Sequence, residues 1–449
     1  MLSKSTYTRG VNCHRSLWLY KNKKQEQKFS VSTQRIFSRG TDVGILAADY
    51  FPGGIMAVEG DYPTYKSAEY TKELIENGTE VIYEATFIFD DTLVAVDILA
   101  KIDGKWSIFE VKSTNSTKSQ HVLDVAVQYY VAKGSGLDIA DTYIMHFNRE
   151  YVRKGDIDVK QLFAYDSVTD QVLELQDEIK DYIPILQDVV KGEEPKIEMG
   201  YHCDNPYHCD FYDYCLALNP PMESEDEVEL SSIPEVHKDE LQEFIDRLQY
   251  PLYYLDFETI MPGVPMFDES RPYQQVPFQY SLHWQNEKDG KVFHTHYLAE
   301  SKTNIDPRKT LIEQMIKDTK SAKTILVYYI SFERGRINEM IRDFPKYTVG
   351  LTSIVNKLDD LIIPFKQKLY CTETMLGSSS IKKVLPALCP QLSYSDLDIG
   401  DGMTASNSFL DLYDCNDQEH IEETRKSLLD YCHLDTLAMV KILEVLKKS

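Results

Sequence analysis

Apolar positions along the first half of the chain follow the period-two pattern of strands, with one helical stretch among them. Three runs rich in β-branched and aromatic residues are separated by Asp-Asp and Asp-Gly turn signals, and a helical pattern and a further strand follow. The expected strands are 79–90, 92–102, 105–112 and 141–148, and the expected helix is Ser119–Lys133. This order of three strands, a helix and a strand predicts an α/β domain.

A second α/β set follows, with its strands first. The expected strands are Leu252–Glu258, Phe278–Trp284, Val292–Leu298 and Thr324–Ile330, and the expected helices are Pro307–Thr319, Glu333–Asp343 and Gln418–Lys447. Between the two sets lies 219–236, which has two prolines and then five acids within Glu223–Glu229. Such a segment has no apolar face to bury, and its like charges extend it. We therefore expect domains at 1–222 and 250–449, joined by an acidic linker and helix at 223–249.

The 449 residues include 72 acids and 48 bases, a formal net charge of −24, which at first argues against a polyanionic partner. The charge is unevenly spread, however. Residues 1–50 hold 9 bases and 3 acids, residues 51–220 hold 14 and 31, residues 221–250 hold 2 and 10, and residues 251–449 hold 23 and 28. The total therefore does not exclude nucleic acid. The basic arm Lys21–Lys28, with Arg35 and Arg39, is a candidate phosphate contact or, equally, a solvated surface helix.

The N-terminal segment lacks the apolar core of a signal peptide, and no stretch reaches the length of a membrane span. We expect a cytoplasmic protein with no membrane partner. The eight cysteines then do not predict disulfides, because that compartment keeps thiols reduced.

A first group of polar residues falls on the expected strands of the first domain. Asp97 ends one strand, and Glu110 and Lys112 share one face of the next strand across a hairpin turn. Burying them is costly unless they bind something. Two carboxylates can hold a hard divalent cation, which Glu84 could join, and the Lys can orient or activate a water. The alternative is an exposed hairpin with a cross-strand ion pair.

The helix that follows carries Gln128-Tyr129-Tyr130, with His121 and Asp124 one or two turns earlier. This arrangement resembles the RecB-like branch of the PD-(D/E)XK nucleases, over roughly residues 1–218. The resemblance implies that Asp97, Glu110, Lys112 and Gln128 are catalytic, and that Glu84, Asp97 and Glu110 bind Mg²⁺ or Mn²⁺.

Four cysteines flank this first group of polar residues. Cys13 precedes it, and Cys203, Cys209 and Cys215 follow it within thirteen residues. A subset of RecB-like nucleases holds a [4Fe–4S] cluster with one N-terminal and three C-terminal cysteines, so the resemblance implies such a cluster here. The spacing C-x5-C-x5-C departs from the commoner pattern, in which the first pair is closer. Zn²⁺ is the alternative, with His14, His202 or His208 able to replace a thiolate.

A third group lies in the second half. Asp256 and Glu258 share a strand face, Glu333 follows a buried strand, and Tyr431 and Asp435 are an i, i+4 helical pair. Their order resembles that of the DnaQ-like (DEDD) exonucleases of the ribonuclease H-like fold. The resemblance implies that Asp256, Glu258 and Asp435 bind two metal ions and that Tyr431 positions the water.

Two residues depart from the DnaQ-like pattern. Glu333 stands where an Asp is usual, and Tyr329 stands where an Asn is common. Between the motifs, the segments PFQYSLHW, SIKKVLPAL and SYSDLDIGDGMTA are similar to those of a bacterial family described as predicted RecB-family nucleases of unknown function. That resemblance spans nearly the whole chain.

We therefore expect a metal-dependent nuclease that cleaves DNA, in preference to RNA, at ends or in single strands, in repair, recombination or defence. The abundant tyrosines (30 of them) suit stacking on single strands, although most of them would lie in the core. The alternatives are a non-catalytic nucleic-acid-binding or assembly module with degenerate sites, and an RNA-processing exonuclease. Protein partners are not indicated.

Overall fold

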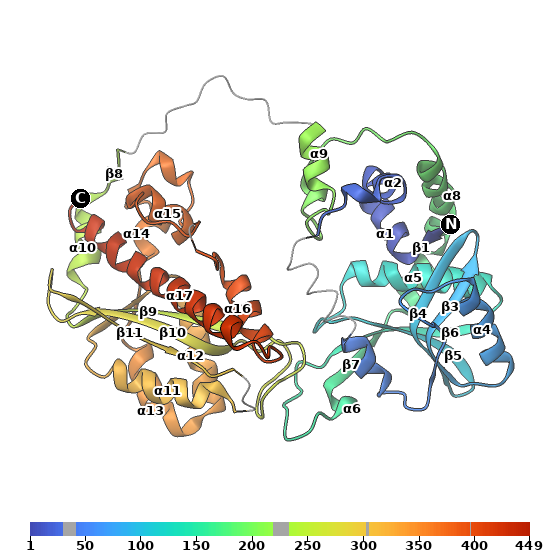
Figure 1. Ribbon diagram of the computed structural model, residues 1–449, viewed down its shortest axis with the longest axis horizontal. Coiled ribbons are helices and arrows are strands. Elements are labelled where there is room, and N and C mark those ends of the chain that lie inside the picture. Colours follow the sequence, from blue (N-terminus) through green and yellow to red (C-terminus); the bar gives the residue numbers. More distant parts are fainter. Residues whose placement is uncertain (30–41, 219–232, 302–304, 396) are drawn as a thin grey trace. The chain divides into compact units, whose positions relative to one another are not determined.

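The computed structural model describes residues 1–29, 42–218, 233–301, 305–395 and 397–449, so that Arg35, Arg39 and most of the expected linker lie outside the described residues. The chain separates into two compact units, Met1–Glu225 and Asp226–Ser449. Each unit combines helices with a mixed sheet (Figure 1), which confirms the expected α/β class.

The first unit is built on a seven-stranded sheet with the order β2-β3-β4-β5-β6-β7, in which β1 pairs with β4. The strands are β1 (Leu2–Ser3), β2 (Ile55–Met56), β3 (Val81–Phe89), β4 (Thr92–Ile102), β5 (Lys105–Val111), β6 (Ile139–Phe147) and β7 (Phe163–Ser167). β3, β4 and β5 form an antiparallel meander. β6 pairs in parallel with β5, so the chain must cross over between them, and a helix makes that crossover.

The crossover helix is α5 (Ser119–Gly134), which contacts β3, β4 and β6. Its buried residues join one apolar core with those of the sheet and of neighbouring helices. The other helical elements of the unit are α1 (Lys4–Asn12), α2 (His14–Asn22), η1 (Lys24–Glu26), α4 (Tyr65–Glu76), α6 (Val159–Leu162), α7 (Thr169–Glu174), α8 (Gln176–Lys191), η2 (Tyr201–Cys203) and α9 (Tyr212–Leu218). Of these helical elements, only α5 was predicted from the sequence.

The second unit contains a five-stranded sheet with the order β11-β10-β9-β12-β13. Its strands are β9 (Leu252–Ile260), β10 (Val276–Gln285), β11 (Val292–Leu298), β12 (Thr324–Val327) and β13 (Leu358–Asp360). β9, β10 and β11 are antiparallel, whereas β12 runs parallel to both β9 and β13. The expected strand Thr324–Ile330 is wrong at its end, because α12 already begins at Ile330.

Side chains alternate between the two faces of this sheet, and each face has its own helices. On one face, Tyr253, Leu255 and Phe257 pack with α11 (Pro307–Asp318), α12 (Ile330–Asp343) and α13 (Thr348–Val355). On the other face, Leu252 and Tyr254 pack with the long helix α17 (Gln418–Leu446), and Figure 1 shows helices on both sides of the strands. Asp256 and Glu258 follow the parity of Leu252 and Tyr254, so they belong to the α17 face.

The expected linker helix belongs to the second unit. α10 (Lys238–Asp246) buries Leu241, Phe244 and Ile245 in the same core as α17. Just before it, β8 (Glu235–Val236) pairs with β14 (Tyr370–Cys371), so the end of the expected linker is a strand. The remaining helical elements are η3 (Pro345–Tyr347), α14 (Ile363–Lys366), η4 (Glu373–Met375), α15 (Ile381–Leu388) and α16 (Gly402–Asp411).

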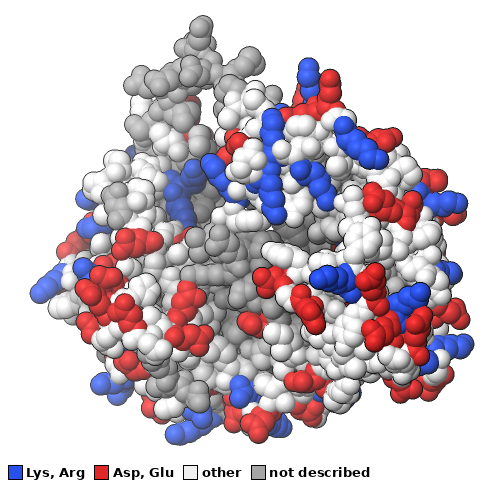
Figure 2. Space-filling model, turned by 45° about the vertical axis from the view of Figure 1, so that its right-hand side comes forward, with Lys and Arg blue, Asp and Glu red and all other residues white. Residues whose placement is uncertain are grey.

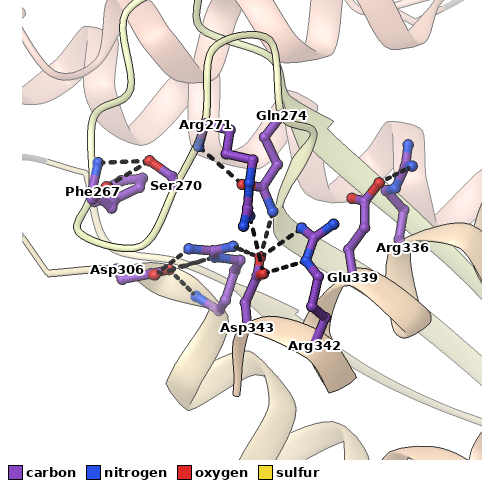
Figure 3. A network of polar contacts seen from close by, with 10 residues as sticks. Phe267, Ser270, Arg271, Gln274, Asp306, Arg336, Glu339, Arg342 and Asp343 are labelled. Atoms are coloured by element: carbon purple, nitrogen blue, oxygen red, sulfur yellow. Dashed lines mark hydrogen bonds and ion pairs between the residues drawn. The ribbon is translucent and has the colours of Figure 1, made fainter. Parts of the chain in front are cut away.

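A buried polar network fixes the C-terminal end of α12 (Figure 3). The Asp343 carboxylate accepts hydrogen bonds from Gln274 at 2.6 Å, Arg342 at 2.8 Å and Arg308 at 3.0 Å. Arg308, on α11, is almost fully buried and also donates to both carboxylate oxygens of Asp306. Burial raises the pKa of Asp343, but the Arg342 and Gln274 hydrogen bonds outweigh it and hold that pKa below its usual value. α11, α12 and the loop before β10 are thus tied together at one carboxylate.

Among the described residues, no helix is both long and apolar enough to cross a membrane. On the face drawn in Figure 2, acidic and basic side chains are interspersed with uncharged surface. The net charge therefore does not appear there as one continuous acidic field.

Candidate functional sites

The first candidate site lies where β4 and β5 separate. Their pairing ends at Ile98 and Phe109, and beyond it the backbone N–H of Val111 donates to the Asp97 carboxylate at 2.7 Å. On the other side of β4, the pairing with β3 skips Glu84, whose φ of 51° is in the left-handed region. No residue is inserted here, because Tyr83 pairs with Ile98 and Ala85 with Val96 in the same register, so the pairing is interrupted at Glu84 alone. The backbone irregularities thus fall at two of the residues expected to bind metal.

The predicted residues Glu110, Lys112 and Gln128 are brought into direct contact. Lys112 Nζ lies 2.8 Å from Glu110 Oε1 and 2.5 Å from Asp124 Oδ2, and Gln128 Nε2 donates to Glu110 Oε2 at 2.6 Å. Glu110 and Gln128 are buried, so the hairpin is not an exposed ion pair. The Oε1 atom of Gln128 is buried and has no hydrogen-bond partner among the described residues.

Sequence reasoning missed Lys4, which completes this first site from helix α1. Its ammonium lies 2.6 Å from Glu110 Oε1, the same oxygen that Lys112 contacts. A lysine near the N-terminus, 106 residues away from its partner, gives no local signal in the sequence. Only the folded chain shows that two cations meet at one buried carboxylate.

Burial and mutual charge separate the protonation states of these groups. Burial, reinforced by the Glu110 charge, raises the pKa of Asp97 to about 8, and burial also raises the pKa of Glu84. Burial alone would raise the pKa of Glu110, but the ammonium groups of Lys112 and Lys4 hold it below its usual value. Lys112 has a raised pKa, because Glu110 and Asp124 outweigh the effect of burial. In this state Lys112 is a fixed positive charge and not a proton acceptor.

The second candidate site lies on the α17 face of the second sheet. Asp256 and Glu258 of β9 and Cys432 of α17 offer ligand atoms that all lie within 4.8 Å of one another. Cys432 follows the predicted Tyr431 directly, and sequence reasoning did not select it. Strand parity therefore directs Asp256 and Glu258, which were expected to bind metal, toward α17.

Asp435 joins this second site one turn further along α17. Its carboxylate accepts a hydrogen bond from the Tyr394 hydroxyl at 2.7 Å, and Tyr431 lies close to the charges of Asp435, Glu258 and Asp256. Lys382 adds a positive charge near Glu258 and Asp435. Tyr394 and Lys382 lie in two of the three segments that resemble the bacterial family, SYSDLDIGDGMTA and SIKKVLPAL. That resemblance was the one indication in the sequence that these two residues belong to the site.

Glu333 reaches the second site from the first turn of α12. It is buried, its charge acts on Asp256, and its Oε2 has no hydrogen-bond partner among the described residues. Tyr329, just before the helix, has a φ of 78°. The Asp360 carboxylate accepts hydrogen bonds from the backbone N–H groups of Tyr329, at 3.0 Å, and Ile330, at 2.9 Å, and so holds this conformation.

The acids of the second site all have raised pKa values, and in each case burial is the largest cause. The pKa of Glu333 rises to about 8 and that of Asp435 to about 7. The pKa values of Asp256 and Glu258 rise well above their usual range, because the charge of Asp435 adds to the effect of burial. Such groups carry negative charge at neutral pH only if cations compensate it.

All four predicted cysteines line one cavity, together with His202 and Arg15. Cys215 interacts electrostatically with the other three, and none of the four is in a disulfide. In the described part of the chain, no three of the four thiol sulfur atoms all lie within 4.8 Å of one another. Of the alternative ligands, His14 bonds Tyr182 at 2.7 Å and His208 bonds Asp204 at 2.6 Å, so only His202 faces this cavity.

The basic arm makes contacts inside the first unit. Lys23 donates to Tyr214 at 2.7 Å and to Glu194 at 3.1 Å, and Lys28 pairs with Asp213 at 3.1 Å. These lysines lie beside the cysteine segment, and their charge is partly neutralised there.

Comparison with known proteins adds a family match and relatives. The profile of a family described as "Domain of unknown function (DUF2779)" matches residues 253–380, which include Asp256, Glu258 and Glu333 but not Tyr431 or Asp435. The chain is 29% identical over 213 residues to "Uncharacterized protein MG366 homolog" of Mycoplasma pneumoniae, with 44% of this chain and 32% of the relative covered.

A similar relative is "Uncharacterized protein MG366" of Mycoplasma genitalium, 26% identical over 229 residues, with 45% of this chain and 34% of the relative covered. Another is "Uncharacterized protein UU173" of Ureaplasma parvum, 26% identical over 230 residues, with 45% and 32% covered. The chain thus spans about a third of the length of the curated relatives it matches. These descriptions assign no activity.

Proposed function

We propose that this protein is a divalent-metal-dependent nuclease with two separate acidic sites, one in each unit, and that DNA is its substrate. The observation that carries the proposal is that each sheet holds a set of buried or partly buried carboxylates that outnumber the positively charged side chains beside them. In the first site, Glu84, Asp97, Glu110 and Asp124 surround two lysines. In the second, the charges of Glu258, Glu333 and Asp435 act on Asp256, and Lys382 lies near Glu258 and Asp435.

The arrangement of strands around these acids supports the proposal. The meander β3-β4-β5, the crossover helix α5 and the parallel strand β6 agree with a PD-(D/E)XK-type core. The order β11-β10-β9-β12-β13, with β10 antiparallel, agrees with a ribonuclease H-like core. Asp97 and Glu110 lie on the neighbouring strands β4 and β5, and Asp256 and Glu258 lie on β9, whereas Glu333 and Asp435 come from the helices α12 and α17.

The donor set fits hard divalent cations. Mg²⁺ and Mn²⁺ prefer oxygen ligands, and both sites offer carboxylates with an orphaned polar oxygen, that of Gln128 or Glu333. Glu84, Asp97 and Glu110 would hold metal in the first unit, and Asp256, Glu258 and Asp435 in the second. When bound, such ions stabilise the attacking and leaving oxygens of an in-line phosphoryl displacement.

The chain's own side chains then have defined tasks. Tyr394 fixes the Asp435 carboxylate through its hydrogen bond, and Tyr431, on the same helix, is placed to orient the attacking water. Lys112 remains protonated between Glu110 and Asp124, so it orients water and stabilises charge and does not abstract a proton. Gln128 positions Glu110.

The test is a cleavage assay on the full chain with labelled single- and double-stranded DNA and RNA, with Mn²⁺ or with chelator. Asp97→Asn and Asp256→Asn should each lower the activity of their own site at least about a hundredfold, because a metal centre contributes several kcal/mol to the transition state. The exposed acids Asp103 and Asp246 provide matched Asp→Asn controls, one in each unit. If both active-site variants cleave like the wild type, the sites are wrongly assigned.

One observation favours a second candidate for the first unit, a non-catalytic nucleic-acid-binding module. The Lys4 ammonium contacts the Glu110 oxygen that a cation would use. This alternative would be favoured if the protein binds DNA after chelation and shows no Asp97-dependent cleavage of any substrate.

For the cysteine cavity, we propose a [4Fe–4S] cluster held by Cys13, Cys203, Cys209 and Cys215. A zinc ion bound at about 2.3 Å by four thiolates needs all its sulfur atoms about 3.8 Å apart, whereas among the described residues no three of these four sulfur atoms lie within 4.8 Å of one another, which favours the larger cluster. Anaerobically purified protein should be brown and contain about four irons, and Cys215→Ser should lose them. Cys371→Ser, in the second unit, is the control; stoichiometric zinc without iron would reject the cluster.

A further inference from the structure

Three histidines converge on the α17 face of the second sheet. His283 of β10 and His294 of β11 are cross-strand partners, and His433 projects toward them from α17. The ring centroids are 4.4 Å apart for His283 and His294, 4.3 Å for His294 and His433, and 4.8 Å for His283 and His433. Each ring offers a nitrogen that lies within 4.8 Å of the other two.

The spacing of two of these nitrogens matches a metal coordination shell. Zn²⁺ binds imidazole nitrogen at about 2.0–2.1 Å in tetrahedral geometry, so two ligand nitrogens lie about 3.3–3.4 Å apart. The distance from His433 Nδ1 to His294 Nε2 is 3.3 Å. Without a metal, one of these two nitrogens must donate to the other, whereas a cation accepts the lone pairs of both.

The groups around the three histidine rings favour binding of a metal cation. Burial is the largest cause that lowers the pKa of His283 to about 3 and of His294 to about 4, so both rings are neutral and have an unshared electron pair. The Nδ1 of His283 bonds the Thr436 hydroxyl at 2.8 Å, which leaves Nε2 available. Such outer contacts fix the orientation of ligating histidines. His283 is buried, whereas the other two rings are more exposed, so an ion has access.

The ligand type separates this group from the acids nearby. Imidazole nitrogen suits zinc and related transition metals, whereas Mg²⁺ and Ca²⁺ require oxygen. Ser281 links the two regions, because it pairs with Asp256 in the strand register and its hydroxyl lies 3.0 Å from His294 Nε2 and 2.6 Å from Thr436 Oγ1. The two sets of ligands therefore lie side by side on one sheet face.

We propose that His283, His294 and His433 bind one Zn²⁺ ion, with water as the fourth ligand, and that this ion holds α17 against β10 and β11. Three protein ligands and a water form a complete zinc coordination shell. The ion would join three elements that are distant in sequence. The site does not depend on the proposed nuclease function.

The test uses the full chain, stripped of metal by chelator and titrated with Zn²⁺ alone. Zinc bound per chain after gel filtration should be lower by one in His294→Gln and in His433→Gln than in the wild type. His420→Gln is the matched control, because His420 is an exposed histidine on the same helix. Substitution with Co²⁺ should show tetrahedral visible bands that disappear in His294→Gln and that lack a thiolate charge-transfer band, which distinguishes them from the cysteine site.

Stability supplies an independent measurement. Zinc at a hundredfold excess over its Kd should raise the Tm of the second unit by about 5–10 °C in the wild type and in His420→Gln, but not in His294→Gln. Equal zinc content and equal Tm shifts in all variants would overturn the proposal and leave the three rings as a hydrogen-bonded polar cluster. His294→Gln, on the more exposed strand, answers the question even if His433→Gln fails to fold.

Discussion

At the scale of single residues, Lys4 changes the interpretation of the first site. Its ammonium and that of Lys112 share one oxygen of the buried Glu110 carboxylate. Two positive charges at one carboxylate oppose the entry of a third. Lys4 is therefore both a stabilising ion-pair partner and a competitor of a metal ion for Glu110.

We predict that Lys4→Met binds Mn²⁺ at the first site about tenfold more tightly than the wild type, the equivalent of about 1.4 kcal/mol. In the absence of metal, the same change should lower the free energy of unfolding of the first unit by about 2 kcal/mol, because a charge-assisted hydrogen bond is lost. Mn²⁺ titration by electron paramagnetic resonance in an Asp256→Asn background isolates this site. Lys101→Met, an exposed lysine on β4, is the control. Unchanged Mn²⁺ affinity would show that Lys4 does not compete.

At the scale of elements, the anchoring of α12 decides where Glu333 lies. Glu333 is in the first turn of this helix, and Asp343, its last residue, accepts hydrogen bonds from three arginines and a glutamine. The helix is thus held at the end opposite to the second candidate site.

Asp343→Ala should lower the free energy of unfolding of the second unit by about 3 kcal/mol, because Arg308 stays buried with only Asp306 as its partner. Urea denaturation of the full chain measures the change, and the exposed Asp246→Ala is the control. A loss below about 0.5 kcal/mol would mean that Arg308 finds water or another partner.

The same carboxylate predicts a pH dependence. The pKa of Asp343 is lowered in the folded state, so its contribution to stability is present above the unfolded pKa, near 3.8. It is lost as the pH falls through the lower, folded value. The wild type should therefore lose stability below about pH 4 more steeply than Asp343→Asn, as measured by Tm against pH; parallel curves would contradict this.

The elements also show what a sequence can and cannot predict. The strands β3 to β6 and β9 to β11 were expected to within about two residues, because runs of β-branched and aromatic residues and turn signals are local. The expected β12 was three residues too long. The strands β1, β2, β7 and β13 and the helices α13 to α16 were missed, since they are short and their burial depends on distant partners. Asp97, Glu110 and Lys112 could be found because a hairpin joins them, whereas Lys4 and Tyr394 meet their carboxylates only through the tertiary fold.

At the scale of the whole molecule, the negative net charge opposes the binding of DNA that the two proposed nuclease sites require. A chain with a net charge of −24 does not attract DNA through its overall field. On the face drawn in Figure 2, acidic and basic side chains are interspersed. In the basic arm, Lys23 and Lys28 pair with Glu194 and Asp213. If DNA is the substrate, as proposed, its phosphate contacts must be few and local.

We predict a shallow salt dependence of binding to single-stranded DNA. With no more than about four phosphate contacts, the slope of log K against log salt should be no steeper than about −3. Fluorescence anisotropy in Ca²⁺, which replaces Mg²⁺ without supporting most cleavage reactions, gives the slope. A slope steeper than about −6 would reveal an extended basic surface.

The cysteine cavity closes a loop, with consequences for the continuity of the backbone. In the sequence, Cys13 and Cys203 lie on either side of strands β2 to β7 and of the exposed turn Lys154–Asp156. A protease that nicks this turn would produce two polypeptides, each of which carries cysteines of the proposed cluster. If the cluster is bound, its metal–sulfur bonds would hold the two polypeptides together. The nicked protein should then remain one particle under mild denaturant until the metal is removed, so this measurement would report whether the proposed cluster is present.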